Sequence, residues 1–470
     1  MNPKRRLGFV LVGLVLLLAV AAALMFMAEN TAESCTVAVI SAHASPDGRP
    51  MIWKNFDMSQ YWHQQVKYYP VVNTAAGRYY LLYHDNDSIW AASGAITPQS
   101  GVNEAGFALG LAAVAESNPM HESSNYNTHF LGDAVANCAS LTDFEAYAKT
   151  WPQAHKGHAV SANFVAIDAL GGAALYEMYT GSGSLSAGPP IQYKKYDANN
   201  GQVSDSRGNV ITPAQGNSFI GFYAASNLNS YFPNNAGKER YERANSLLAG
   251  LAQKDPVTGK TQLNSGNIMR IVSKDVTSPS GGNNSSYSTT YCISRSQTRS
   301  GTVVEGVPAG GDPRLTVFWT ALGEPSVSVY IPTIVGARSV SPYARADSIQ
   351  SDGTIVDQSD KCLLNLAEDA RETYNNLIYS SNRGSAVSGP NDKTINKNEL
   401  AKVQQWTFVV EATVVQHTNE YLNELRNNPA LVSPEGLEAF QNYAVKYVYD
   451  NYTAGSAAAV PWESALFDSL

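Results

Sequence analysis

The chain has 470 residues, of which 44% are hydrophobic and 15% charged, and its formal net charge at pH 7 is -8. This composition is typical of a globular protein with a large core, and it excludes the basic stripe of a nucleic-acid-binding protein. Four cysteines are too few for a disulfide framework. Cys138, Cys292 and Cys362 would allow one pair in an oxidising compartment, and any of the three pairings stays open.

The first 34 residues have the pattern of a leader that directs export. Basic residues at positions 4–6 precede an almost wholly apolar run at 7–28, and small residues stand three and one before Cys35. Cleavage after Ser34 would deliver the protein to the periplasm or the outside of the cell. It would also leave Cys35 as the first residue of the mature chain.

Two other interpretations of the leader remain open. A lipoprotein signal also ends at a cysteine, although it favours a small residue where Glu33 stands. The apolar run, at roughly 22 residues, is also long enough to span a bilayer as an uncleaved anchor. The protein would then be associated with the membrane through its leader alone.

A cysteine at the first position of a chain can carry its own base. The free α-amine has a pKa of about 7.7 to 8 and lies beside the thiol, so it can accept the thiol proton. The sequence therefore predicts that Cys35 supplies nucleophile and general base together once the bond from Ser34 is cut. A retained leader would keep the amine acylated, and the chain would then be a non-catalytic, membrane-anchored binding protein.

After the leader, residues 36–119 alternate short apolar runs with turns, which is typical of strands. The β-branched run at 36–40, the turn sequence Ser45-Pro-Asp-Gly48 and the apolar run at 51–53 predict a hairpin. Such pairing would bring Asp57 close to Cys35.

Downstream, helices and strands are predicted to alternate with glycine- and asparagine-rich loops. A helix is predicted at 143–150, with Thr142 and Glu145 at the spacing of a capping box. Strands are predicted at 163–167 and 173–178, where apolar and β-branched residues cluster. This region therefore indicates an α+β protein.

Polar residues stand at the ends of predicted strands and at the start of one predicted helix. Lys54 and Asp57 follow the second apolar run. Asn227 follows the apolar run at 219–223, where its side-chain amide could donate to an oxyanion. Arg240 opens a predicted helix, where a guanidinium could hold a carboxylate. Taken singly, each residue is equally typical of a solvated strand end or helix turn.

Residues 344–470 change to helical periodicity, with helices predicted at 363–379, 399–426 and 437–449. Ser433-Pro434 is a start signal for the last of these, because serine caps a helix and proline suits its first position. Six apolar residues of the second helix share one face and are interpreted as a packing surface: Val403, Trp406, Val410, Val414, Tyr421 and Leu425. The tail is expected to pack on the catalytic region or against a second copy in a homo-oligomer.

The sequence contains no motif for a metal or an organic cofactor. His155-Lys-Gly-His158 has no acidic or thiol partner nearby in the sequence, and no His-Glu-x-x-His motif occurs. The glycine pairs at 171–172 and 310–311 fit strand turns better than phosphate cradles. A cofactor-free enzyme is predicted.

The order of several motifs resembles the penicillin-acyltransferase-like branch of the N-terminal-nucleophile (Ntn) hydrolases, relatives of the choloylglycine hydrolases and of a cysteine dipeptidase family. The resemblance covers roughly residues 35–335. The motifs that carry it are Cys35-Thr36, Ser45-Pro-Asp-Gly-Arg-Pro50, Trp53-Lys-Asn-Phe-Asp57, Gly101-Val-Asn-Glu-Ala-Gly106, Ala162-Asn-Phe164, Gly171-Gly-Ala173, Tyr176-Glu177, Arg240-Tyr241, Ser294-Arg295 with Thr298 and Ser300, Gly306-Val-Pro-Ala-Gly-Gly-Asp-Pro313, Leu322-Gly-Glu-Pro325 and Ile331-Pro332.

The resemblance implies a four-layer αββα sandwich in which two antiparallel sheets are covered by helices. The expected organisation is a leader at 1–34, a catalytic domain at 35–343 and a helical C-terminal extension at 344–470 packed on that domain. The implied reaction is cofactor-free hydrolysis of a carbon–nitrogen bond in a linear, small-molecule amide, or transfer of its acyl group.

The resemblance also assigns roles to residues. Cys35 would be the nucleophile, Asp57 would orient its α-amine, and Asn227 would donate to the oxyanion. Lys54 and Arg240 would lie around the pocket where relatives place an arginine. The full set of candidate catalytic residues is Cys35, Lys54, Asp57, Asn227, Arg240 and Arg295.

Two features differ from the family pattern. Choloylglycine hydrolases carry an asparagine in the strand after the Asn-Glu-x-Gly turn, whereas this chain has Gly110-Leu-Ala-Ala-Val114, where a backbone N–H would replace that donor. Many relatives free their nucleophile by self-cleavage, whereas Ser34 here also suits a signal peptidase. Acyl transfer and a cysteine dipeptidase activity remain alternatives.

Overall fold

A computed structural model describes most of the chain. It covers residues 34–57, 63–70, 76–85, 97–114, 126–181, 184–228, 230, 237–277, 292–295, 297–344, 347–349, 355–357, 363, 366, 397–454 and 461–462. The leader up to residue 33, Cys362 and nearly all of the helix predicted at 363–379 lie outside these ranges. Among the described helices, none combines the length and the apolar character that crossing a membrane requires.

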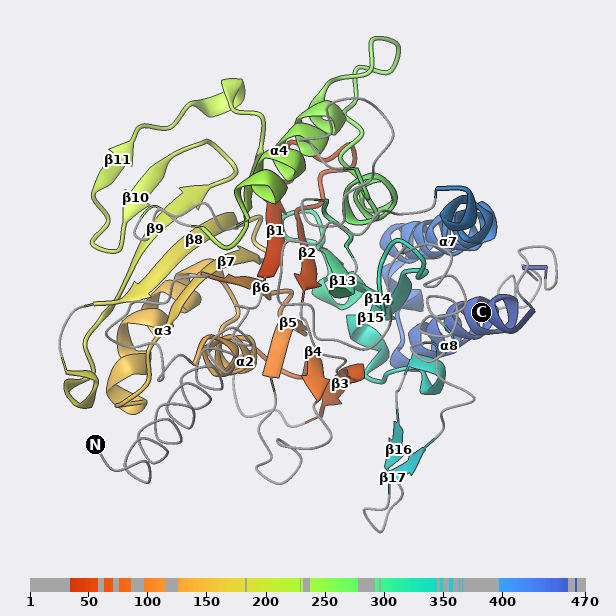
Figure 1. Cartoon of the computed structure of the whole chain (residues 1–470), viewed down its shortest axis with the longest axis horizontal. Helices are drawn as coiled ribbons and strands as arrows, with labels where there is room; N and C mark the ends of the chain where they lie inside the picture. Colours follow the sequence, from red (N-terminus) through yellow and green to blue (C-terminus); the bar gives the residue numbers. More distant parts are fainter. Residues whose placement is uncertain are drawn as a thin grey trace, which may run out of the picture.

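Two large antiparallel sheets form the centre of the described structure (Figure 1). The first contains, in spatial order, β12 (Phe222–Ala225), β1 (Ser34–Ile40), β2 (Met51–Asp57), β13 (Thr298–Glu305), β14 (Val317–Leu322) and β15 (Ile331–Ile334). The second contains β11 (Val210–Thr212), β10 (Val203–Asp205), β9 (Ile191–Asp197), β8 (Ala173–Thr180), β7 (Ser161–Ile167), β6 (Ala108–Ala113), β5 (Thr97–Asn103), β4 (Tyr79–Asp85) and β3 (His63–Tyr69). A small separate hairpin pairs β16 (Asp347–Ile349) with β17 (Ile355–Asp357).

The two large sheets face each other, and helices cover the outer sides. Ile52 of β2 packs toward Gly110 of β6, and buried residues of both sheets belong to one continuous core. Helices α2 (Asn127–Asn137) and α3 (Leu141–Ala154) bury Phe130, Phe144 and Trp151 against the nine-stranded sheet. The predicted α+β class and the αββα layering are confirmed.

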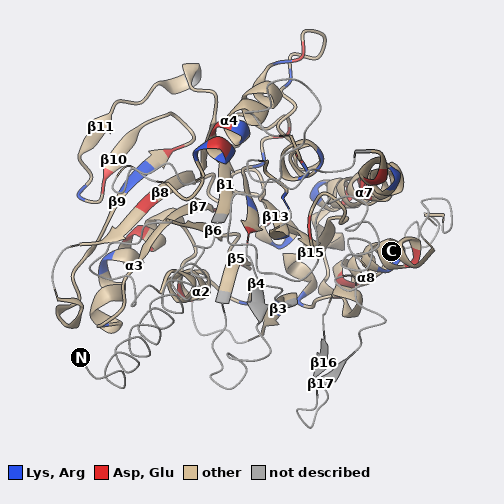
Figure 2. Ribbon diagram, viewed as in Figure 1, with Lys and Arg blue, Asp and Glu red and all other residues tan. Residues whose placement is uncertain are grey.

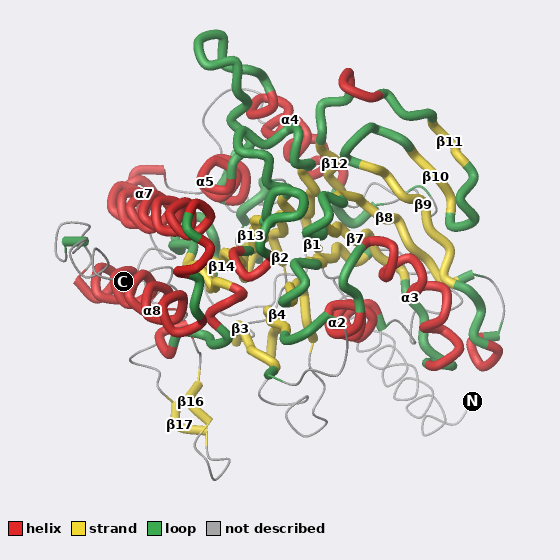
Figure 3. The backbone as a smooth tube through the Cα atoms, turned by 180° about the vertical axis from the view of Figure 1, so that it is seen from behind, coloured by secondary structure: helices red, strands yellow, loops and turns green. Residues whose placement is uncertain are grey.

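The remaining helices lie on the side of the six-stranded sheet, as the view from behind also shows (Figure 3). They are α4 (Lys238–Ala252), α5 (Ser265–Asn267), α7 (Lys397–Asn427) and α8 (Pro434–Ala454). The short helical turns are η2 (Leu185–Ala187), η3 (Gly216–Ser218), η4 (Ile268–Ser273), η5 (Pro313–Leu315), η6 (Val335–Ala337), η7 (Pro342–Ala344) and η9 (Pro429–Leu431).

The predicted hairpin at the start of the catalytic region is confirmed. Strands β1 and β2 pair antiparallel from Ile40 with Met51 to Ser34 with Asp57. Gly48 in the connecting turn has φ +75°, a conformation that strongly favours glycine. The hairpin therefore places Asp57 opposite Ser34, beside the bond between Ser34 and Cys35.

The helix predicted at 143–150 is α3, but its cap was placed too late in the sequence. The N-cap is Ser140, whose hydroxyl accepts from the Asp143 amide at 3.1 Å and donates to the Asp143 carboxylate at 2.9 Å. Ser140 has the extended backbone that a cap needs, whereas Thr142 is already inside the helix. The strands predicted at 163–167 and 173–178 are confirmed as β7 and β8.

The two C-terminal helices predicted at 399–426 and 437–449 are confirmed as α7 and α8. Ser433 caps α8, because its hydroxyl accepts from the Gly436 amide at 3.1 Å. Helix α8 lies along the end of the six-stranded sheet, where the Ile334 amide of β15 donates to the Gln441 side chain at 2.7 Å. Of the six residues assigned to the packing face of α7, four are buried and two are half-buried.

Charged side chains are unevenly distributed over this architecture. Figure 2 shows many of them on helices α4 and α7 and on strands β8 and β9. Some charged side chains are buried instead of exposed. Among them are Lys54, Asp57, Arg240 and Arg295, each of which is at most 9% exposed. Burying ionised groups is costly unless they are paired, so their clustering marks a specialised site.

Candidate active site

Cys35 lies on β1, between β12 and β2, and is fully buried. Its backbone N–H donates to the Asn227 side-chain oxygen at 3.1 Å, and its carbonyl accepts from the Ser226 hydroxyl at 2.9 Å. The register explains both contacts. Val37 pairs with Ala225, so the residues that follow β12 lie alongside Cys35.

The thiol of Cys35 points toward the nine-stranded sheet, where it meets Lys54. The Lys54 ammonium donates to the sulfur at 3.5 Å, to the Gln99 side-chain oxygen at 3.0 Å and to the Leu111 carbonyl. Lys54 is 2% exposed. A buried positive charge at this position stabilises a thiolate relative to a thiol.

Asp57 points to the opposite face of β2, because side chains alternate along a strand. One carboxylate oxygen accepts from Arg295 Nε at 2.9 Å, and the other accepts from the Thr298 hydroxyl at 2.6 Å. Arg240 Nε approaches the same carboxylate at 3.8 Å. The carboxylate is therefore held between two guanidinium groups.

Arg240 reaches into the site from helix α4 and connects its two parts. Its Nη2 donates to the Asn227 oxygen at 2.6 Å and to the Ser226 hydroxyl at 3.3 Å. Burial and, to a smaller extent, the charge of Arg295 lower the pKa of Arg240, while Asp57 and Cys35 oppose the shift, and the net pKa is about 10. Arg240 therefore stays positively charged near neutral pH.

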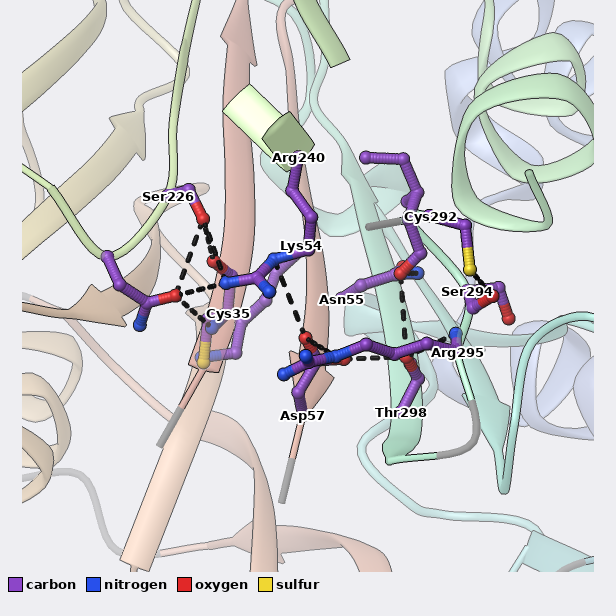
Figure 4. Close-up of polar contacts among 12 residues, drawn as sticks. Cys35, Lys54, Asn55, Asp57, Ser226, Arg240, Cys292, Ser294, Arg295 and Thr298 are labelled. Carbon is purple, nitrogen blue, oxygen red and sulfur yellow. Dashed lines mark hydrogen bonds and ion pairs between the residues drawn. The ribbon is translucent and has the colours of Figure 1, made fainter. Parts of the chain in front are cut away.

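The six residues predicted for the site form one continuous series of contacts, although they come from separate segments (Figure 4). The series runs through Lys54, Cys35, Asn227, Arg240, Asp57 and Arg295. The series contains a thiol, a backbone nitrogen, a carboxylate and three cations, all of them buried, on the two faces of the six-stranded sheet. Electrostatic interactions are strong between buried groups because little water screens them.

Asn227 makes contacts that differ from its predicted role. Its oxygen accepts from Cys35 and Arg240, and its Nδ2 donates to the Ala113 carbonyl at 2.7 Å. Strand β6, which was expected to offer an N–H donor, thus contributes two carbonyl acceptors. The Leu111 carbonyl accepts from Lys54, and the Ala113 carbonyl accepts from Asn227. Donation by Asn227 to an oxyanion, and a backbone N–H donor in this strand, stay predictions.

Three contact residues were absent from the predicted set. Ser226 adjoins Asn227, so the register of β1 with β12 would have indicated it. Thr298 was noted only as part of a motif, and its role follows from its pairing with Asp57 between β13 and β2. Gln99 lies on β5 of the other sheet, and no sequence signal connects it with Lys54.

The other described cysteines differ from Cys35 in their surroundings. Cys138 and Cys292 are buried thiols that are not bonded to each other, so that pairing is excluded. Burial raises the pKa of Cys138 to about 12 and the pKa of Cys292 well above its ordinary value. The Cys292 thiol donates to the Ser294 carbonyl at 2.8 Å. Both stay protonated and are poor nucleophiles at neutral pH.

No group of three or more histidine, cysteine, aspartate or glutamate side chains in the described ranges could hold a metal ion. The histidine pair does have an acidic neighbour that the sequence did not reveal. Asp133 of α2 lies 3.5 Å from His155 Nε2. His158 instead stacks on Tyr126, with ring centroids 3.6 Å apart.

Comparison with solved structures gives a distant likeness. An N-acylethanolamine-hydrolyzing acid amidase ortholog from Caenorhabditis elegans is similar over 61% of this chain and 99% of its own, at 13% identity and a TM-score of 0.35. Two variants of the conjugated bile acid hydrolase from Clostridium perfringens are similar over 70% of this chain and 94% of their own, at 10% identity and a TM-score of 0.29. No family model matches the chain, and no curated protein matches its sequence. TM-scores this low say nothing about the reaction.

Proposed function

We propose that the chain is an exported amide hydrolase of the N-terminal-nucleophile type, in which cleavage after Ser34 turns Cys35 into nucleophile and base. The observation that supports this most directly is the position of Cys35 within the buried series of six contacting residues, which we call the cluster. Its nitrogen contacts Asn227 at 3.1 Å and its sulfur contacts Lys54 at 3.5 Å. Both reactive atoms of the residue thus have a polar partner.

These positions support the following reaction. The free α-amine takes the thiol proton, and the thiolate attacks the amide carbonyl, forming a carbon–sulfur bond and an oxyanion. Collapse breaks the carbon–nitrogen bond, and the protonated α-amine gives its proton to the leaving nitrogen. Water, activated by the same amine, then hydrolyses the thioester. An amine in place of water would give acyl transfer.

The cluster residues have distinct tasks in this scheme. Lys54 stabilises the thiolate that the α-amine generates. The Asn227 oxygen accepts one N–H of the amine, which directs the remaining lone pair toward the thiol. Asp57, held by Arg295 and Thr298, supplies negative charge near the protonated amine.

Processing would change both the chemistry and the access of this site. Ser34 pairs with Asp57 in the continuous chain, and Cys35 is fully buried. Removing Ser34 would create the base and vacate the strand position opposite Asp57. Export and activation would then be coupled in a single cleavage, by signal peptidase or by the chain itself.

A matched pair of proteins tests the proposal. One begins at Cys35 and the other at Ser34, and both are assayed against a panel of N-acylated amines, N-acyl amino acids and dipeptides. Only the first is expected to turn over, because the second has an acylated Cys35 nitrogen. Equal turnover by both would rule out the α-amine as the base.

The same experiment separates the alternatives. Release of amino acids from dipeptides, without hydrolysis of the other amides, would identify a dipeptidase. Intact mass of the protein recovered from its native host reports whether residues 1–34 are still attached. A folded chain that retains them would favour the membrane-anchored binding protein.

A further inference from the structure

The C-terminal extension reaches the interior of the catalytic region through a buried ion pair. Glu411 of α7 lies 2.7 Å from the Lys274 ammonium, and the two side chains are 5% and 1% exposed. Lys274 follows η4 and also donates to the Ser328 carbonyl at 2.6 Å. Burial lowers the pKa of Lys274, while Glu411 counteracts the shift. The pair fixes α7 against the segment that carries Ser273.

Tyr330 connects Glu411 with Ser273. Its backbone N–H donates to the same Glu411 carboxylate at 2.9 Å, and its hydroxyl lies 2.5 Å from the Ser273 hydroxyl. Ser273 donates its single hydroxyl proton to Asn55 at 2.6 Å, so Tyr330 must be the donor in its own contact with Ser273. The hydrogen bonds thus run in one direction, from Tyr330 to Asn55.

Asn55 connects Ser273 with the strand that carries Lys54 and Asp57. It lies on β2 between Lys54 and Asp57, on the same face as Asp57, and is fully buried. Its Nδ2 donates to the Ser273 carbonyl at 2.8 Å and to the Ile293 carbonyl at 3.3 Å. Asn55 therefore ties the catalytic strand to both segments that pack on it.

The Ile293 carbonyl completes the connection with the site. It lies 3.4 Å from the Thr298 hydroxyl oxygen. Thr298 donates its one hydroxyl proton to Asp57 at 2.6 Å (Figure 4). The packing around the Tyr330 hydroxyl is tight. A Cβ at Gly301, which pairs with Asn55, would lie 2.0 Å from the Tyr330 hydroxyl oxygen. We call Glu411, Lys274, Tyr330, Ser273 and Asn55 the relay.

We infer that the C-terminal extension is a positioning element of the active site, which acts through the relay on strand β2. This inference rests on the proposed function of Cys35. Every relay residue is buried, and the relay ends on the strand that carries Lys54 and Asp57. Its members touch no reacting atom, so they are positioning residues. Breaking the relay should disturb Cys35 more than an equal loss of stability elsewhere would.

Tyr330→Phe tests this in the protein that begins at Cys35, with Tyr80→Phe as the matched control. Tyr80 is also fully buried and donates one hydroxyl bond, to the Val335 carbonyl at 2.9 Å, away from the relay. Both variants should lower the unfolding midpoint by a similar amount. Only Tyr330→Phe should lower kcat, by about tenfold, with KM within about twofold of the parent, since misplacement of catalytic groups mainly affects kcat.

Ser273→Ala and Ser328→Ala form a second pair that breaks the relay at its next step. Both serines are buried, and Ser328 donates its hydroxyl proton to the Leu322 carbonyl at 2.8 Å, outside the relay. The Ser273 variant should again lose kcat, whereas the Ser328 variant should not. If kcat falls equally within each pair, or falls in neither pair, the extension does not position the site through the relay.

Alkylation of Cys35 keeps this test independent of the substrate. The rate of iodoacetamide modification of the N-terminal peptide, measured by mass spectrometry, should fall in Tyr330→Phe and Ser273→Ala and stay unchanged in the controls. Should the parent hydrolyse no amide at all, the proposed function fails. The alkylation rates then still decide whether the relay positions Cys35.

Discussion

The two faces of strand β2 handle buried charge in different ways. On the face toward the nine-stranded sheet, the Lys54 ammonium meets a sulfur and two neutral oxygens. On the face toward the helices, the Asp57 carboxylate lies between Arg295 at 2.9 Å and Arg240 at 3.8 Å. One face is arranged to favour a thiolate, and the other fixes a carboxylate.

In the proposed reaction, the two faces of this strand would serve different steps. Side chains alternate along β2, so Lys54 and Asp57, which are three positions apart, point into separate layers. The backbone nitrogen of Cys35 lies at the boundary, where Asn227 and Arg240 connect the two layers. Lys54→Met and Asp57→Asn would each remove a charge from one of the two faces.

Cys35→Ala removes the proposed nucleophile, the sulfur that contacts Lys54, and should have the largest effect. Turnover of any amide substrate is expected to fall by about 10⁴-fold or more, because the nucleophile is lost. The matched control is Cys138→Ala, which removes a sulfur that is 1% exposed and lies outside the site. Initial rates of both proteins, each starting at Cys35 or its replacement, give the comparison. A rate in Cys35→Ala that equals the rate of the control would end the proposed mechanism.

Lys54→Met breaks only the face toward the nine-stranded sheet. Loss of the ammonium that donates to the thiol should lower kcat/KM by about 100-fold, the scale of removing one electrostatic donor from an enclosed site. The alkylation rate of Cys35 should also need a higher pH. Lys54→Arg keeps the charge and should recover part of both effects. An unchanged pH profile in Lys54→Met would show that the ammonium does not act on the thiol.

Asp57→Asn breaks only the face toward the helices, and its expected effect is on stability as well as rate. Two buried guanidinium groups would lose their carboxylate, which costs about 3–5 kcal/mol for a buried pair. Urea unfolding at pH 7 measures it. Asp312→Asn is the control, because its partner Arg314 is 39% exposed and such pairs contribute about 0–1 kcal/mol. Equal losses in the two variants would mean that the Asp57 carboxylate stabilises the fold no more than an exposed partner does.

The sequence allowed the hairpin to be predicted, but only some of the contacts around Cys35. The turn at Ser45-Pro-Asp-Gly48 and the flanking apolar runs sufficed to predict the β1–β2 hairpin, and so that Asp57 lies near Cys35. The contact of Lys54 with Gln99 could not be predicted, because it forms between two sheets whose packing has no local signal. The cap of α3 was misplaced because Thr142 and Ser140 are both plausible caps, and only the backbone conformation distinguishes them. The relay joins segments up to 356 residues apart in the chain, from Asn55 to Glu411, and helical periodicity alone gives no indication of it.

Asp47 lies at the turn of the same hairpin, and its replacement should have the smallest effect. It is an exposed carboxylate that can be compared with the buried Asp57. Burial alone would raise its pKa, but hydrogen bonds and charge from Arg49 outweigh burial, so its pKa is lowered from 3.8. A carboxyl whose pKa is lower in the folded chain stabilises it above the unfolded value, and this contribution disappears as the pH falls below 3.8. The side chain is 39% exposed, so water screens the pair and Asp47→Asn should cost at most about 1 kcal/mol at pH 7. Urea unfolding of parent and variant at pH 7 and at about pH 3 should show the difference narrowing on acidification. A difference that widens instead would mean that Asp47 acts through something other than its charge.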